Sequence, residues 1–305
     1  MSQSSIYVWA IDPFSEKAIQ LKIARHLKEF MARSSNEVEP TAVLNPGQLR
    51  IPMDAPDVKS QFKLAAKGAL EKITKSVKIP NMLPPSFVFC EHYSQRKSIE
   101  TFLEFAREKK AELIVLGTHA RSGMQRWLLG SFAESLILHS DIPLLVVNPK
   151  VHKPQKIKTI LFPTDLSPAS ERGLRKLMPT LERLKANLIL YHKMDYVIPE
   201  TYSMIYRTEM YEKYLKDDEK TRHTQLEKWS KMLTEKGIKC DIVIDEKPSF
   251  IPKAIVAAAK KYKAQMIALV SHTGPTSAVF LGSIARQVVR SADCPIWSWH
   301  TRDKI

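Results

Sequence analysis

The sequence predicts an α/β protein of two tandem doubly wound modules, each built on a five-stranded parallel sheet. Three observations carry this prediction. Short apolar runs alternate with amphipathic helical patterns along the chain, as in parallel sheets covered on both faces. Landmarks of the first half recur in the second half at nearly constant spacing. The length of 305 residues suits two modules, each large enough to bury its own core.

Four ordered landmarks define the repeat. A buried strand ends at Asp12 in the first half and at Asp165 in the second half, 153 residues later. The apolar runs 111–119 and 264–272 match at the same spacing. The last two landmarks, both 152 residues apart, are Leu129-Gly130-Ser131 with Leu281-Gly282-Ser283, and Asp141-Ile142-Pro143-Leu144 with Asp293-Cys294-Pro295-Ile296. We therefore predict one module over residues 1–150 and another over 156–305, joined by a Lys- and Pro-rich linker over 149–158.

Strands and helices are predicted in the same order in both modules. In the first module, strands fall near 5–11, 40–44, 86–90, 112–117 and 143–148, with helices near 15–33, 58–77, 97–110 and 130–140. In the second module, strands fall near 158–163, 187–193, 239–244, 265–271 and 295–299, and the charged segment 200–236 predicts one extended helix after a loop. The last strands of the two modules are expected to meet, burying Trp297 and Trp299 there or in a dimer interface.

Composition limits the class of protein. Hydrophobic residues make up 44% and charged residues 26%, as in an ordinary globular domain. The N-terminal residues lack a signal-peptide pattern, and no apolar run approaches the ~20 residues of a membrane span. The three cysteines lie far apart without a C-x-x-C motif, which favours the cytoplasm and argues against a metal site. The net charge of +15 favours either a polyanionic ligand or a basic solvated surface.

The candidate site lies at the carboxyl ends of the strands, where ligands bind in doubly wound sheets. Asp12 ends the first strand and Gly117 ends the fourth, so both are expected at that edge. From Gly117 a loop leads to Gly130-Ser131, which opens a helix. N–H groups at a helix N-terminus bind phosphate, the Ser131 hydroxyl is a further donor, and Arg121 adds positive charge. The alternative is that both glycines only shape turns.

Two segments carry a resemblance to a known family. They are Gly117-Thr118-His119-Ala120-Arg121-Ser122-Gly123 with Leu129-Gly130-Ser131, and Ile160-Leu161-Phe162-Pro163-Thr164-Asp165-Leu166-Ser167. Both resemble signature segments of the universal stress protein family, and the likeness covers nearly the whole chain as two copies. It implies an adenine nucleotide α-hydrolase-like module that forms dimers, often through its last strand. It also implies, in the ATP-binding branch, a loop with Gly, two residues, Gly, nine residues, and a closing Gly followed by Ser or Thr.

Transferred residue by residue, this resemblance implies an ATP site in the first module, with Mg²⁺ accompanying the nucleotide. Gly117 is the first loop glycine and Gly130-Ser131 is the closing pair. Ala120 stands where the family has its second glycine. If that position needs a positive φ, alanine costs ~1–2 kcal/mol, which weakens ATP binding about tenfold without excluding it.

Further residues complete the site that the resemblance implies. Asp12 matches the aspartate that ends the first strand, near the base and ribose. Val43 on the second strand is the counterpart of a residue that contacts the base. His119 and Arg121 flank Ala120 in the loop.

The second copy departs further from the family's loop. Val270 replaces the first glycine and Thr273 the second, and only eight residues separate Thr273 from Gly282. A β-branched side chain is a poor substitute where the backbone must approach a ligand closely. We therefore expect the second module not to bind ATP in the family's usual way. It holds another ligand, for example an anion near Ser283, or serves as a structural partner of the first module.

Three functions follow from these features. The leading one is a cytoplasmic, stress-response protein that binds an adenine nucleotide in its first module, for binding or signalling rather than efficient catalysis, with at most weak ATP hydrolysis. The alternative is a structural or adaptor protein whose modules form an intrachain pseudo-dimer without nucleotide. A nucleic-acid-associated protein ranks last, because only the net charge favours it and the lysines are scattered.

Overall fold

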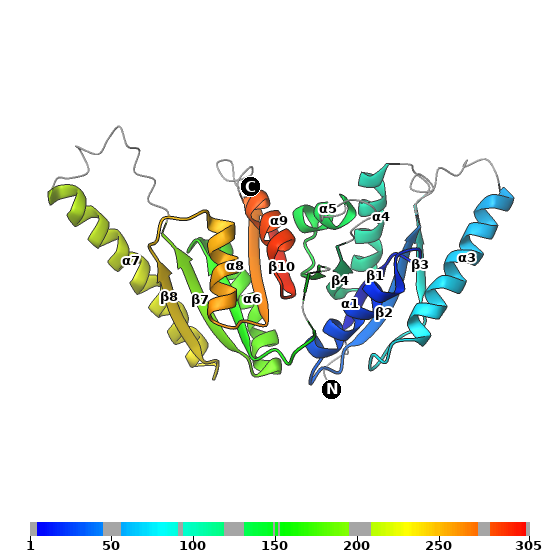
Figure 1. The fold of residues 1–305 in the computed structure, drawn as a ribbon, viewed down its shortest axis with the longest axis horizontal. Coiled ribbons are helices and arrows are strands. Elements are labelled where there is room, and N and C mark those ends of the chain that lie inside the picture. Colours follow the sequence, from blue (N-terminus) through cyan, green and yellow to red (C-terminus); the bar gives the residue numbers. More distant parts are fainter. Residues whose placement is uncertain are drawn as a thin grey trace. The chain divides into compact units, whose positions relative to one another are not determined.

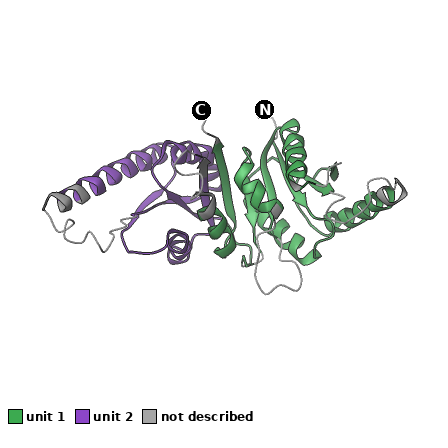
Figure 2. Ribbon diagram, turned by 90° about the horizontal axis from the view of Figure 1, so that it is seen from above, with its two compact units in different colours: residues 1–156, 271–305 green, residues 157–270 purple. Residues whose placement is uncertain are grey.

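The computed structural model describes residues 5–44, 56–90, 94–118, 131–148, 150–151, 153–194, 209–273 and 281–302. The chain divides into two compact units (Figure 2), one of residues 1–156 and 271–305 and the other of residues 157–270. The last helix and last strand of the second repeat thus belong to the first unit. Both units are α/β structures with mostly parallel strands, which confirms the predicted fold class.

The sheet of the first unit has the strand order β3-β2-β1-β4-β5-β10. Neighbouring strands from β3 to β5 are parallel, whereas β10 runs antiparallel to β5. Since β1 lies inside the order and the later strand β4 lies on its other side, the crossovers place helices on both faces. The strands are β1 (Ile6–Ile11), β2 (Glu37–Leu44), β3 (Ser86–Phe89), β4 (Ala111–Gly117), β5 (Leu144–Val147) and β10 (Ile296–Arg302) (Figure 1).

The helices of the first unit pack in neighbouring pairs on this sheet. α1 contacts α3 and reaches β4 and β5, while α4 contacts α5, and α5 contacts α9. The helices are α1 (Lys17–Phe30), α3 (Pro56–Lys75), α4 (Gln95–Glu108), α5 (Ser131–His139) and α9 (Leu281–Ser291) (Figure 1).

The second unit repeats the pattern with the strand order β9-β6-β7-β8, all parallel. The extended helix predicted within 200–236 is α7, and it packs on β8. The elements are β6 (Thr159–Thr164), α6 (Pro168–Leu184), β7 (Asn187–Lys193), α7 (Glu209–Thr234), β8 (Cys240–Asp245), α8 (Ile251–Lys261) and β9 (Met266–Thr273).

Local sequence chemistry explains these boundaries. The apolar run of β1 is buried on both faces of the sheet, with Val8 and Trp9 fully buried. Helix α6 begins where the Ser167 hydroxyl accepts the N–H of Ser170 at 3.1 Å, and Pro168 takes the first helical position, where no N–H is needed. It ends at Lys185, which is left-handed with φ 51°.

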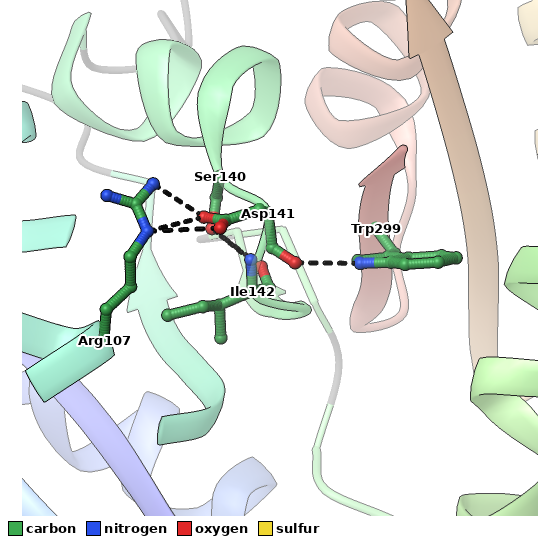
Figure 3. A network of polar contacts seen from close by, with 5 residues as sticks. All are labelled: Arg107, Ser140, Asp141, Ile142 and Trp299. Atoms are coloured by element: carbon green, nitrogen blue, oxygen red, sulfur yellow. Dashed lines mark hydrogen bonds and ion pairs between the residues drawn. The ribbon is translucent and has the colours of Figure 1, made fainter. Parts of the chain in front are cut away.

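The last strands of the two repeats meet, as predicted. β5 and β10 form an antiparallel pair inside the first unit, and Trp297 is only 2% exposed. Trp299 is half-buried, and its indole N–H donates to the backbone oxygen of Asp141 at 2.9 Å (Figure 3). The carboxylate of Asp141 pairs with Arg107, whose Nη2 lies 2.8 Å from Oδ1. The carbonyl of Asp141 thus connects the end of the first repeat to β10.

Candidate functional site

The carboxyl ends of β2, β1 and β4 lie side by side in the first unit, since these strands are adjacent and parallel. Asp12 follows the last residue of β1, Val43 is the penultimate residue of β2, and Gly117 is the last residue of β4. The structure therefore brings these three predicted residues to one edge of the sheet. Val43 is half-buried and Asp12 is exposed.

A hydrogen-bonded turn fixes the segment after β1. Asp12 Oδ1 accepts the N–H of Phe14 at 3.0 Å, and the Asp12 carbonyl accepts the hydroxyl of Ser15 at 2.8 Å. The buried side chain of Gln20 then donates to the Ser15 hydroxyl at 2.7 Å. Phe14 is 50% exposed in this turn and stacks on Phe62 of α3, with ring centroids 5.2 Å apart. The turn thus presents an aromatic ring two residues from Asp12.

Gly117 has a packing role at this edge. A Cβ atom there would touch Ile23 of α1, lying 3.1 Å from Ile23 Cγ1 and 3.6 Å from the carbonyl oxygen of Val147. Helix α1 therefore packs directly over the glycine backbone. This contact constrains residue 117 whatever ligand binds at the edge.

The connection from β4 to α5 holds the remaining predicted residues. Ser131 is the first residue of α5, so a helix begins where the sequence predicts it. The side chain of Ser131, and the predicted site residues His119, Ala120, Arg121 and Gly130, lie outside the described residues. Their roles stay predictions.

The corresponding edge of the second unit has a different turn. Asp165 Oδ1 accepts the N–H of Ser167 at 3.0 Å and the hydroxyl of Ser170 at 2.6 Å. Leu166 between them has a positive φ of 64°, an uncommon conformation for a branched residue. The aspartate therefore supports the start of α6.

A buried histidine marks the end of the second strand in this unit. His192 on β7 is 2% exposed, and its Nδ1 lies 2.8 Å from the carbonyl oxygen of Thr164. Its Nε2 lies 3.0 Å from Nη1 of Arg222 on α7, whose Nε donates to Asp218 at 2.7 Å. A carbonyl only accepts and a guanidinium only donates, so these partners select the neutral tautomer with the proton on Nδ1.

Burial lowers the pKa of His192 below its ordinary value of 6.5, and the Arg222 cation lowers it further against the opposing bond to Thr164. Sequence reasoning missed this pair. A signal existed, because α7 buries Leu226, Trp229 and Leu233 at helical spacing, and four residues before Leu226 the same stripe reaches Arg222. At the carboxyl edge of the second unit, a side chain of the long helix α7 therefore contacts the end of β7.

The described residues contain no group of three or more His, Cys, Asp or Glu side chains arranged to hold a metal ion. Within the same ranges, no helix is both long and apolar enough to cross a membrane.

The fold and the candidate site define the class of protein: tandem doubly wound modules with a candidate ligand site at the carboxyl ends of the strands. The match of the chain to a family model gives the family. The model of the universal stress protein family matches residues 89–148 and 156–298, which together are more than half of the chain. The chain belongs to the universal stress protein family, and the two matched segments show its tandem organisation.

Relatives with known sequences agree. A universal stress protein of Methanocaldococcus jannaschii is 50% identical over 54 residues, 18% of this chain and 29% of that protein. A universal stress protein of Mycobacterium tuberculosis is 26% identical over 203 residues, 65% of this chain and 64% of that protein. The matches thus span less than two thirds of either relative.

Solved structures show the same fold. A universal stress protein from Archaeoglobus fulgidus covers 99% of this chain with 98% of its own, at a TM-score of 0.62 and 16% identity. Universal stress proteins solved with cAMP and with dAMP cover 47% and 46% of the chain at TM-scores of 0.32 and 0.33, and those nucleotides are findings about those proteins.

Proposed function

We propose that this chain binds an adenine nucleotide, ATP foremost, at the carboxyl edge of its first repeat, and acts in a stress response as a binding or signalling protein. The observation that carries the proposal is that β4 ends at Gly117 and α5 begins at Ser131, directly after Gly130 in the sequence, as the phosphate-binding pattern requires. N–H groups at such a helix start suit phosphate oxygens. The proposed binding residues are Asp12, Val43, Gly117, His119, Ala120, Arg121, Gly130 and Ser131.

The described part of this edge fits the other parts of a nucleotide. Asp12 is exposed beside the ends of β1 and β2, where a carboxylate suits ribose hydroxyls. Phe14 offers a half-exposed ring with the polarity and shape to stack on a base. Mg²⁺ would bind together with ATP, coordinated by the phosphate oxygens, which are its usual ligands. Cys90, Cys240 and Cys294 form no disulfide bond, which supports the cytoplasm as the place of action.

Calorimetric titration of the full chain with Mg·ATP tests this proposal. We expect one binding site per chain, and a loss of affinity of about tenfold or more in Gly130→Val, because a branched side chain would block close approach of the phosphates. The matched control is Gly282→Val in the second repeat, which should bind ATP as the wild type does. No heat at millimolar ATP would contradict the proposal, as would undiminished binding by Gly130→Val.

A second candidate function is the structural or adaptor protein without nucleotide. It is favoured by the contact of Arg222 with His192 at the second edge and by the β5–β10 pairing of the two repeats. The same titration separates the candidates, because the adaptor requires a wild-type chain that does not bind ATP.

A further inference from the structure

The junction of β5 and β10 has the symmetry of two like modules facing each other. In this part of the repeat, each residue has its counterpart 152 positions later, as Asp141 has Asp293. Leu145 pairs with Trp297, its own counterpart in the second repeat. Val146, one residue after Leu145, pairs with Ile296, which is the counterpart of Leu144, one residue before Leu145. A pseudo-two-fold axis therefore passes through the Leu145–Trp297 pair, and positions near it face their own counterparts, as in an isologous interface.

The charges near this axis are opposite. Glu134 on α5 and Arg286 on α9 are counterparts, 152 positions apart, and they form an ion pair with Oε1 2.6 Å from Nη1. The other carboxylate oxygen lies 3.5 Å from Nη2 of Arg290. The side chains of Glu134 and Arg286 are only 23% and 35% exposed, so solvent screens the pair incompletely. Like modules in this arrangement would instead place two carboxylates, or a group of arginines, together.

The side-chain sizes at the axis are also complementary. Leu145 is fully buried and Trp297 is 2% exposed, and as directly opposite residues they lie side by side on one face of the sheet. Two leucines there would leave a void, and two tryptophans would overfill the space.

A third contact is also one-sided. The Asn148 amide donates to the carbonyl oxygens of Val289 and Ala292 at 2.7 and 2.6 Å, and so satisfies orphan carbonyls at the end of α9. The counterpart of Asn148 in the second repeat is His300, a residue with a different shape and set of donors.

We infer that the β5–β10 face is heterotypic: it fits the first repeat to the second repeat and rejects either repeat facing its own kind. The complementary charge at Glu134 and Arg286, the complementary size at Leu145 and Trp297, and the Asn148 contact each act in this direction. The partner of each module on this face is therefore the other repeat of the same chain rather than a like module of a second chain.

Charge reversal in the full chain tests the inference. Glu134→Arg and Arg286→Glu should each lower the thermal unfolding midpoint of the first unit by about 2–6 °C, and the double reversal should restore most of the loss. We expect the larger loss from Glu134→Arg, because it gathers three cations, whereas Arg286→Glu leaves Arg290 beside two carboxylates. The matched control reverses the exposed Glu171–Arg175 pair of α6, at 2.7 Å, and should change the midpoint by about 1 °C at most.

The size complementarity gives an independent test if a reversed chain does not fold. Leu145→Trp and Trp297→Leu should each lower the midpoint, and the exchange of both should be more stable than either single variant. Unchanged midpoints in the charge variants, or double variants no more stable than the less stable single ones in both series, would overturn the inference.

Discussion

The fourth strands of the two repeats end differently, and the helix that covers each end compensates for the difference. In the first repeat, β4 ends at Gly117 and α1 places Ile23 over it. In the second repeat, Val270 on β9 holds the corresponding position, and α6 places Gly173 over it. A Cβ atom on Gly173 would lie 3.0 Å from Val270 Cγ1 and 3.1 Å from its Cβ. In the first repeat the strand carries the small residue and the helix the large one, and in the second repeat the arrangement is reversed.

This exchange changes how the glycine of a binding motif is interpreted. Val270 departs from the family's loop pattern, and the departure by itself suggested a lost ligand site. The contacts of Gly117 and Val270 give a packing reason for each residue, because helix and strand must share one volume. A motif glycine that meets a helix side chain is therefore weaker support for a ligand than one that faces open space.

The edges beyond these strands also differ. The first repeat presents the exposed Asp12 and Phe14 in a fixed turn. In the second repeat, Arg222 reaches from α7 to the buried His192. Both repeats expose the aspartate after their first strand, but the first repeat adds an exposed aromatic ring there, whereas in the second repeat a helix side chain bonds to a buried histidine.

The largest effect is expected from Gly173→Ala. The added methyl group would meet the stiff, β-branched Val270 rather than the flexible end of a side chain, so we expect the free energy of unfolding of the second unit to fall by about 1–3 kcal/mol. Gly117→Ala should cost less, because Ile23 Cδ1 can rotate away. Urea titration followed by circular dichroism measures both.

Gly68→Ala is the matched control for this substitution. Gly68 also lies in a helix, α3, but a Cβ atom there would have nothing within 4 Å. Alanine should therefore stabilise the chain by about 0.5–1 kcal/mol. If Gly173→Ala stabilises the second unit as Gly68→Ala does the first, the packing exchange is wrong.

Much of the fold followed from apolar runs and their repetition, and the exceptions have a physical cause. The predicted strand 40–44 begins at residue 37 in the structure, as β2. The sequence did not predict the earlier start of β2, because Glu39 carries a carboxylate, which is not expected inside a strand. The structure buries it to 3% exposure and pairs it with Lys109 at 2.9 Å. Only a tertiary contact makes that position tolerable, so no local pattern predicts it.

For the candidate site, the places of Asp12 and Gly117 follow from strand order, since parallel strands bring their carboxyl ends to one edge. Val43 was assigned from the family resemblance, and the binding roles of all three residues stay predictions. The contact between Gly173 and Val270, and that between Arg222 and His192, join elements far apart in sequence. They depend on how far a helix overlaps a strand, which the periodicity of either element leaves open.

A smaller effect, on the second edge, is expected from pH. The pKa of His192 is lowered by burial and by Arg222, so between that pKa and 6.5 the unfolded chain binds a proton that the folded chain does not. The second unit should therefore lose stability as the pH falls from 7.5 towards 5, by about 1.4 kcal/mol for each unit by which the pKa is lowered. His192→Gln keeps a donor and an acceptor but cannot titrate, and should flatten this dependence.

The control for the pH series is His223→Gln. His223 lies next to Arg222 on α7, but it is exposed and pairs with Glu227 at 3.3 Å. Urea titrations at several pH values should give His223→Gln the slope of the wild type. An unchanged slope in His192→Gln would remove His192 as the cause.

The smallest expected effect concerns the N-terminus of the first helix in each repeat. In the second repeat the Ser167 hydroxyl caps α6 by accepting the N–H of Ser170, whereas Glu16, the N-cap residue of α1, makes no side-chain cap. Ser167→Ala should therefore cost about 1 kcal/mol, and Ser167→Asp should preserve stability, because aspartate caps equally well. Glu16→Ala should change the free energy of unfolding by less than about 0.5 kcal/mol. Equal losses for Ser167→Ala and Glu16→Ala in urea titrations would show that the cap does not distinguish the repeats.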